Sequence, residues 1–308
     1  MDNYCAAIDL GTNTARLLIA KRLSSGIVPV RIEREIVRLG GDFTDESGLS
    51  VGAQERGLAC LRRFSAIIAE YGVIPVLASA TSAVRDAVNG GDFVERVFRE
   101  TGIALVVIDG DLEAKLTLNG VLSVIDSDCD TLVVLDVGGG STEFTVSAHK
   151  TPVFVKSMPI GVVRLTEGFR TAAEMVARVR SVIDLLEKDL TSAGISVSGD
   201  FELVGTAGTA TTIAAIKLEM VDYDYRHVNN FVVDREDISE IFQRLLQLSP
   251  QERLTIKGLE KGREDLIIAG LLITTSIMDR FGFKRLKVSD FGLLEGLALS
   301  VSGPGCLI

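Results

Sequence analysis

The sequence predicts an α/β protein built from two similar domains, and three observations carry this prediction. Strand and helix patterns alternate along both halves of the chain. A strand, a turn containing glycine and a second strand occur near residue 9 and again near residue 136. The chain has 308 residues, which is long for a single hydrophobic core. Together these features favour a duplicated α/β unit.

The turn near residue 136 has the composition of a phosphate-binding loop. Three successive glycines, Gly138–Gly140, let backbone N–H groups approach an anion and tolerate the positive φ angles of an anion-binding nest. Asp136 ends the strand before the turn, Ser141 offers a hydroxyl, and Glu143 lies on the strand that follows. Carboxylates beside a phosphate imply a divalent cation between them, and Mg2+ suits this role.

The first turn aligns with the second without a gap. Asp9, Gly11 and Thr14 match Asp136, Gly138 and Ser141 at equal offsets. Each turn leads into a strand, and neither is followed by Gly-Lys-Ser/Thr, so a P-loop is excluded. Two phosphate-binding hairpin loops are therefore predicted, and the alternative is two ordinary glycine hairpins that coincide.

Composition excludes several classes of protein. The hydrophobic fraction of 47% predicts a well-buried core, and no apolar run approaches the length of a membrane span. A net charge of −10 argues against a broad nucleic-acid surface. The four cysteines are scattered without metal-binding spacing, and the amino terminus lacks the pattern of a signal peptide, so a cytoplasmic location is expected.

The alternation of elements places the two domains at residues 1–127 and 128–308, with a crossover near the polar segment 126–130. A C-terminal helix at about 293–303 could pack back on the first domain. Strands are expected at 4–9, 15–21, 27–38, 73–80, 103–108, 131–137, 142–148, 151–159, 201–205 and 285–289. Helices are expected at 51–70, 93–100, 111 onward, 172–192, 207–216, 235–247, 263–281 and 293–301.

A third loop has a different form. Gly205, Thr206, Gly208 and Thr209 lie where a strand passes through a glycine turn into a helix. The first N–H groups of that helix have no partner within it and could bind an anion.

Glu113 follows the strand at 103–108 and lies at the start of a helix for which Asp111 is the expected N-cap. Two interpretations of Glu113 stand. Its carboxylate could complement the helix dipole, or it could take a proton from an attacking water.

Six motifs in order resemble the exopolyphosphatase and guanosine pentaphosphate phosphatase (Ppx/GppA) family, in a short form that lacks the C-terminal HD-type domain. They are the segments at residues 7–14, 80–90, 136–144, 159–165, 205–211 and 288–296. The resemblance implies two ribonuclease-H-like domains of the actin, hexokinase and Hsp70 superfamily facing a central cleft. It also implies Mg2+-dependent release of terminal orthophosphate from inorganic polyphosphate, or conversion of guanosine pentaphosphate to the tetraphosphate.

The resemblance also assigns roles by position. Glu113 matches the family's water-activating glutamate, and Arg85 matches an arginine that meets phosphate. Arg85 could instead pair with Asp86 beside it. The metal set is Asp9, Asp136 and Glu143. The phosphate-binding set is Gly11, Thr12, Asn13, Gly138, Gly139, Gly140, Ser141, Gly205, Thr206, Gly208 and Thr209.

Three departures from the family pattern stand out: Asp109 where Ser is frequent, Lys115 where Arg is frequent, and Ala207 where Gly is frequent. The extra charge of Asp109 could recruit a cation or weaken the binding of a polyanion.

Three further questions stay open. A non-catalytic sensor of a nucleotide or alarmone is the alternative function, and a kinase of the same superfamily is a weaker one. The sequence does not decide between polyphosphate and guanosine pentaphosphate as substrate. The apolar helix at 267–278 could serve a homodimer as well as a core.

Overall fold

The computed structural model describes residues 4–23, 26–72, 75–198 and 201–302. The chain forms two compact units. Unit 1 comprises Met1–Ser123 and Gly292–Ile308, and unit 2 comprises Val124–Phe291. The division therefore falls after Ser123 rather than after residue 127, and the C-terminal segment belongs to unit 1.

Unit 1 contains a five-stranded mixed sheet in the order β3-β2-β1-β4-β5. Strands β1, β2 and β3 form an antiparallel meander, and β4 and β5 continue the sheet parallel to β1. The strands are β1 (Tyr4–Leu10), β2 (Thr14–Leu23), β3 (Gly26–Ile36), β4 (Val76–Ala80) and β5 (Leu105–Val107). The helices are α1 (Val51–Glu70), α2 (Ser82–Arg85), α3 (Gly90–Thr101), α4 (Gly110–Leu122) and α12 (Leu293–Ser302).

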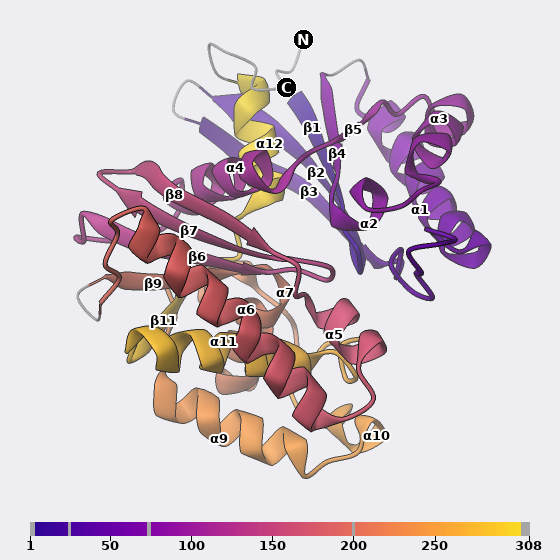
Figure 1. Cartoon of the computed structure of the whole chain (residues 1–308). Helices are drawn as coiled ribbons and strands as arrows, with labels where there is room; N and C mark the ends of the chain where they lie inside the picture. Colours follow the sequence, from indigo (N-terminus) through magenta and orange to yellow (C-terminus); the bar gives the residue numbers. More distant parts are fainter. Residues whose placement is uncertain (1–3, 24–25, 73–74, 199–200, 303–308) are drawn as a thin grey trace. The chain divides into compact units, whose positions relative to one another are not determined.

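Helices cover both faces of this sheet because its central strands are apolar on both sides. In β1, Ala6 and Ile8 pack in the cluster that includes α1 and α3, whereas Cys5 and Ala7 pack in the cluster that includes α4 and α12. Figure 1 shows α12, in yellow, beside α4 although some 170 residues separate them in sequence. Gly296 permits the close approach, since a Cβ there would lie 1.9 Å from the carbonyl oxygen of Leu116.

Unit 2 repeats the pattern of unit 1 in a six-stranded sheet, in the order β10-β11-β9-β6-β7-β8. Strand β6 pairs with β7 antiparallel and with β9 parallel, as β1 pairs with β2 and β4. The strands are β6 (Thr131–Val137), β7 (Thr142–Ala148), β8 (Thr151–Met158), β9 (Glu202–Thr206), β10 (Val232–Asp234) and β11 (Arg285–Val288). The predicted fold class, α/β with two related ribonuclease-H-like sheets, is confirmed.

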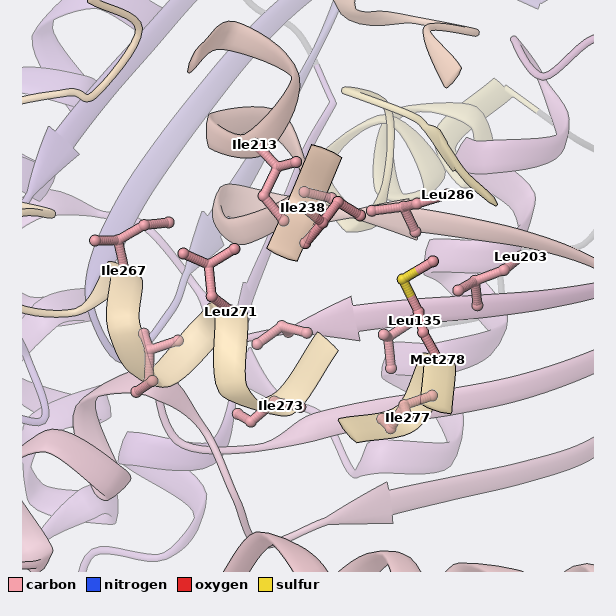
Figure 2. Packing of buried hydrophobic residues seen from close by; sticks show 14 of the residues in the cluster. Leu135, Leu203, Ile213, Ile238, Ile267, Leu271, Ile273, Ile277, Met278 and Leu286 are labelled. Atoms are coloured by element: carbon pink, nitrogen blue, oxygen red, sulfur yellow. The ribbon is translucent and has the colours of Figure 1, made fainter. Parts of the chain in front are cut away.

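Helix α11 is the centre of the unit 2 core. Its residues Ile267, Leu271, Ile273, Ile277 and Met278 are buried among side chains from the sheet and from neighbouring helices (Figure 2). Helix α11 packs against α6 and α9, and Figure 1 shows α6 crossing α11. The helices are α5 (Val162–Gly168), α6 (Ala172–Ser192), α7 (Ala207–Lys217), α8 (Tyr225–Val228), α9 (Arg235–Leu246), α10 (Pro250–Arg253) and α11 (Ile267–Phe281).

Some element boundaries differ from the prediction. Helix α11 begins at Ile267 rather than at residue 263, because residues 263–266 form a turn in which the Arg263 carbonyl accepts from the N–H groups of Leu266 and Ile267. The short elements α2, α5, α8, α10 and β10 were not predicted, since three to seven residues carry too little periodic signal. The predicted strand residues 73–74 and helix residue 303 lie outside the described residues. Among the described helices, none has the length and apolarity needed to cross a membrane.

Candidate active site

The strand register places the loop carboxylates in equivalent positions of the two sheets. Asp9 on β1 lies directly opposite Arg16 on β2, and Asp136 on β6 lies directly opposite Glu143 on β7. Directly opposed residues of an antiparallel pair project from the same face of the sheet. The two halves thus present a carboxylate facing an arginine in unit 1, and a carboxylate facing a second carboxylate in unit 2.

In unit 1 the charge of Asp9 is compensated by Arg16. Both Nε and Nη2 of Arg16 donate to Oδ2 of Asp9, at 3.2 and 3.0 Å. The side chains are only 21% and 11% exposed, so the pair is weakly screened by solvent. Arg16 was not among the predicted site residues, although its alignment with Glu143 was visible in the sequence.

In unit 2 the opposed carboxylates of Asp136 and Glu143 are both buried, at 8% and 2% exposure. Ser157 on β8 donates its hydroxyl to Oε1 of Glu143 at 2.7 Å. Two negative charges placed directly opposite each other repel. A bound cation would relieve this repulsion, and carboxylate oxygens are ligands that suit Mg2+. In the described part of the chain, no group of three or more His, Cys, Asp or Glu side chains is arranged around one metal position. A cation here would therefore take its remaining ligands from water or a bound phosphate.

The first loop is linked to helix α2 through a buried pair of hydroxyls. Oγ1 of Thr12 and Oγ of Ser82 lie 2.9 Å apart. The side-chain amide of Asn13 is 6% exposed, and neither its nitrogen nor its oxygen has a hydrogen-bond partner within the described residues. A buried amide without a partner is costly, so a ligand or water is expected to bind it. Ser82 was missed because its contact with Thr12 spans 70 residues.

The second loop is held from behind by helix α5. The carbonyl of Gly138 accepts from the N–H of Val162, and the carbonyl of Gly139 accepts from Val163, both at 2.9 Å. Because the N–H in a planar trans peptide points opposite to the C=O, the N–H groups of Gly139 and Gly140 point away from α5. They are oriented as an anion site requires.

The backbone of this loop does not use positive φ angles, and Gly161 at the start of α5 packs closely against it. The described glycines with positive φ all lie elsewhere in the chain, so the expected use of positive φ at Gly138, Gly139 and Gly140 was wrong. Gly161, the N-cap of α5, is tightly enclosed, since a Cβ there would lie 2.4 Å from the carbonyl oxygen of Gly139. Ser141 is buried at the end of the loop, and its carbonyl accepts from the N–H of Gly138 at 3.0 Å.

The third loop joins β9 to α7, as predicted, with Thr206 as the N-cap. Most of its predicted residues have packing partners. Oγ1 of Thr206 donates to the Phe291 carbonyl at 3.1 Å, Thr209 packs against Gly270, and a Cβ at Gly205 would lie 2.9 Å from Leu286.

Gly208 is the exception in the third loop, because a guanidinium lies against it. A Cβ at Gly208 would lie 1.9 Å from Nη1 of Arg263. Arg263 is 11% exposed in its ion pair with Glu260. A cation beside a helix N-terminus favours anion binding. Arg263 was expected only as the first residue of the helix at 263–281, and nothing in its local sequence indicates this contact.

Ala207 in the third loop has a φ of 59°, in the left-handed region that disfavours residues with a Cβ. We expect Ala207→Gly to stabilise the protein by about 1 kcal/mol, because the relief of strain exceeds the extra entropy of the unfolded chain. Chemical denaturation measures this change, with Ala210→Gly inside the same helix as the control that should destabilise. A loss of stability in Ala207→Gly would contradict the prediction.

Glu113 and Arg85 form a pair within unit 1. Glu113 is 7% exposed in the first turn of α4, and its Oε2 lies 3.5 Å from Nη1 of Arg85. The same Nη1 donates to the Ile108 carbonyl at 3.1 Å, and Nε lies 3.5 Å from Oδ1 of Asp86. Arg85 therefore contacts both the predicted catalytic glutamate and the neighbouring aspartate, and it is held at the end of β5 rather than free in solvent.

The N-cap of α4 is Asp109 and not Asp111, so that expectation was wrong. Oδ1 of Asp109 accepts from the N–H of Leu112 at 2.8 Å, and Asp111 is exposed in the first turn. Ser and Asp are both good N-cap residues, which explains how Asp109 can replace the Ser that is frequent in the family.

Thiol chemistry is disfavoured at the buried cysteines. Burial, with a smaller contribution from Glu35, raises the pKa of Cys60 to about 12, and burial also raises the pKa of Cys5. Both thiols are therefore protonated near neutral pH and do not act as nucleophiles.

Comparisons with known proteins identify the family of the chain. Exopolyphosphatase 2 of Mycobacterium tuberculosis is 33% identical over 97% of this chain and 98% of its own length. A bifunctional 3-dehydroquinate synthase/phosphatase of Fusobacterium nucleatum is 34% identical over 96% of this chain, which spans only 46% of that relative.

Solved structures are similar along nearly the whole chain. An exopolyphosphatase from Cytophaga hutchinsonii superposes with a TM-score of 0.86 at 26% identity, covering 96% of each chain. The PPX-GPPA enzyme of Aquifex aeolicus superposes with a TM-score of 0.79 at 31% identity, covering 96% of this chain and 99% of its own. The family model described as Ppx/GppA phosphatase matches residues 18–303. With the family model, the relatives and the solved structures in agreement, the chain belongs to the Ppx/GppA phosphatase family of hydrolases.

Proposed function

We propose that the protein is a Mg2+-dependent phosphohydrolase that releases terminal orthophosphate from inorganic polyphosphate, from guanosine pentaphosphate, or from both. The observation that carries this proposal is the buried carboxylate of Glu113, held beside the guanidinium of Arg85. A general base must be held in a defined position, and the contact with Arg85 and the place of Glu113 in the first turn of α4 support this role.

In this mechanism Glu113 accepts a proton from a water molecule while the water oxygen attacks the terminal phosphorus. The bond to the bridging oxygen breaks, and the shortened polyphosphate or the guanosine tetraphosphate leaves. Arg85 orients the Glu113 carboxylate and can donate to a phosphoryl oxygen, since a guanidinium has five N–H donors. Phosphoryl transfer needs little more from a protein than such positioning and charge neutralisation.

Mg2+, when bound, would neutralise charge on the phosphoryl oxygens. Asp136 and Glu143 are the residues best suited to hold it, because their opposed carboxylates bring two negative charges to one buried place. Asp9, the third predicted ligand, already has its charge compensated by Arg16, which makes a second cation beside it less favourable. The N–H groups of the glycine loop would bind phosphoryl oxygens directly.

The test is phosphate release by the purified protein, with polyphosphate of defined lengths and guanosine pentaphosphate offered side by side, with and without Mg2+. We expect release that requires Mg2+, and the ratio of the two kcat/KM values identifies the preferred substrate. Tight binding of a nucleotide without any release would overturn the proposal in favour of a non-catalytic sensor. Transfer of phosphate to an acceptor other than water would favour a kinase.

A further inference from the structure

A turn at residues 37–41 is hydrogen-bonded to the back of the first phosphate loop. The N–H groups of Val37 and Arg38 both donate to the carbonyl of Asn13, at 3.0 and 2.9 Å. The N–H of Gly40 donates to the carbonyl of Thr12 at 2.8 Å. Two successive carbonyls of the loop are thereby directed toward the turn.

This arrangement determines where the amides of the loop point. The described residues contain no cis peptide bond, so each N–H points opposite to the carbonyl of the preceding residue. With the carbonyls of Thr12 and Asn13 held by the turn, the N–H groups of Asn13 and Thr14 are directed away from it. The second loop achieves the same result with helix α5, whose N–H groups hold the carbonyls of Gly138 and Gly139.

The 37–41 turn differs from the N-terminus of α5 in that it contains strained backbone. Arg38 and Asp42 have φ angles of 45° and 57°, which cost residues with a Cβ about 1–2 kcal/mol each. Gly40 is pressed against the loop, because a Cβ there would lie 2.4 Å from Cγ2 of Thr12. A strained segment of this kind persists only where its surroundings hold it in place.

Arg56 on helix α1 supplies that support. Its Nε donates to the carbonyl of Val37 at 2.8 Å, and its Nη2 donates to the carbonyl of Arg38 at 2.9 Å. The guanidinium spans the start of the turn with two charge-assisted hydrogen bonds in a fixed planar geometry. Its helix is anchored in the core by the adjacent residues Gly57 and Leu58, so Arg56 connects the turn to a rigid element.

We propose that Arg56 is a positioning residue for the first phosphate loop, acting through the 37–41 turn to direct the N–H groups of Asn13 and Thr14 toward a phosphoryl group. The inference rests on the proposed function, because it assigns those N–H groups to the same polyphosphate or nucleotide phosphates. Arg56 itself acts on the loop from behind and does not contact the reacting atoms.

The experiment compares Arg56→Ala with Arg62→Ala, a variant of the same helix whose arginine pairs with Glu100 on α3. Both are assayed for the Kd of polyphosphate, and for KM and kcat of phosphate release, with and without added methylguanidine. We expect Arg56→Ala to raise Kd and KM about tenfold, from the loss of one to two charge-assisted hydrogen bonds. Methylguanidine, which can reoccupy the vacated space and donate to both carbonyls, should restore most of the affinity. Arg62→Ala should change Kd and KM less than about twofold.

A purely structural contribution of Arg56 would lower the unfolding temperature without changing the Kd of the folded protein, and that result would overturn the inference. So would an increase in Kd that Arg62→Ala shares or that methylguanidine does not reverse. If the wild type binds polyphosphate without hydrolysing it, the proposed function fails, while the Kd comparison still decides the role of Arg56. Absence of polyphosphate binding by the wild type would overturn both.

Discussion

Glu113→Gln is expected to lower kcat for phosphate release by about 10²–10⁴-fold, the range that general bases contribute. The amide of Gln cannot accept the proton of the attacking water, although it has nearly the shape of the carboxylate. Arg85 keeps its hydrogen bond to the Ile108 carbonyl at 3.1 Å, so the surroundings of the site should persist. The Kd for polyphosphate should therefore change much less than kcat.

Asp111→Asn is the matched control for this variant. Asp111 lies in the first turn of α4, as Glu113 does, but it is exposed. If Glu113 served only the helix dipole, the two variants would have similar small effects on stability and on kcat. Near-wild-type turnover in Glu113→Gln would show that another group activates the water.

Glu143→Gln is expected to change stability and activity in opposite directions. Without Mg2+ the variant should be more stable than the wild type by about 1 kcal/mol, because it removes one of two buried carboxylates that face each other across β6 and β7. The Gln side chain can still accept the hydrogen bond from Ser157. Mg2+-dependent hydrolysis should fall about 100-fold or more, since a metal contributes several kcal/mol to such a transition state.

Thermal denaturation with and without Mg2+ measures the first effect, and phosphate release measures the second. The wild type should be stabilised by Mg2+ through mass action, and Glu143→Gln should lose most of that stabilisation. Glu202→Gln is the matched control, because the Glu202 carboxylate pairs with Lys287 at 2.7 Å. Glu202→Gln removes this ion pair, so it should lower the stability of the protein. It should leave the stabilisation by Mg2+ intact. A Glu143→Gln variant that is less stable without Mg2+ and keeps the full response would contradict this assignment.

Short-range spacing was sufficient to predict the two hairpin loops. In a two-strand hairpin the length of the turn sets the register, so residues at fixed distances from the turn lie opposite each other. The spacing of Asp136 and Glu143 from the turn is therefore enough to indicate that the two residues lie opposite each other. The same spacing places Arg16 opposite Asp9 on the neighbouring strand.

Local propensity does not distinguish between two residues that are equally suited to one structural position. Asp109 and Asp111 are equally good N-caps, and the cap is Asp109 because α4 begins at Gly110, directly after it. Similarly, three adjacent glycines suggested positive φ, whereas none of the three has a positive φ, and the N–H groups of α5 hold the carbonyls of Gly138 and Gly139. In both cases the local sequence permits two conformations, and contacts with the rest of the structure determine which one forms.

The sequence therefore determined the fold class, the two loops and the carboxylates on their strands, because alternation, turn length and residue type act over a few residues. Tertiary structure decided the contacts that complete each loop: Ser82 on Thr12, Arg263 on Gly208, and Arg56 on the 37–41 turn. It also placed α12 in unit 1, an arrangement that the sequence had left open, where the helix covers an apolar face of the sheet. No local pattern encodes these contacts, because each joins segments that only the packing of a complete core brings together.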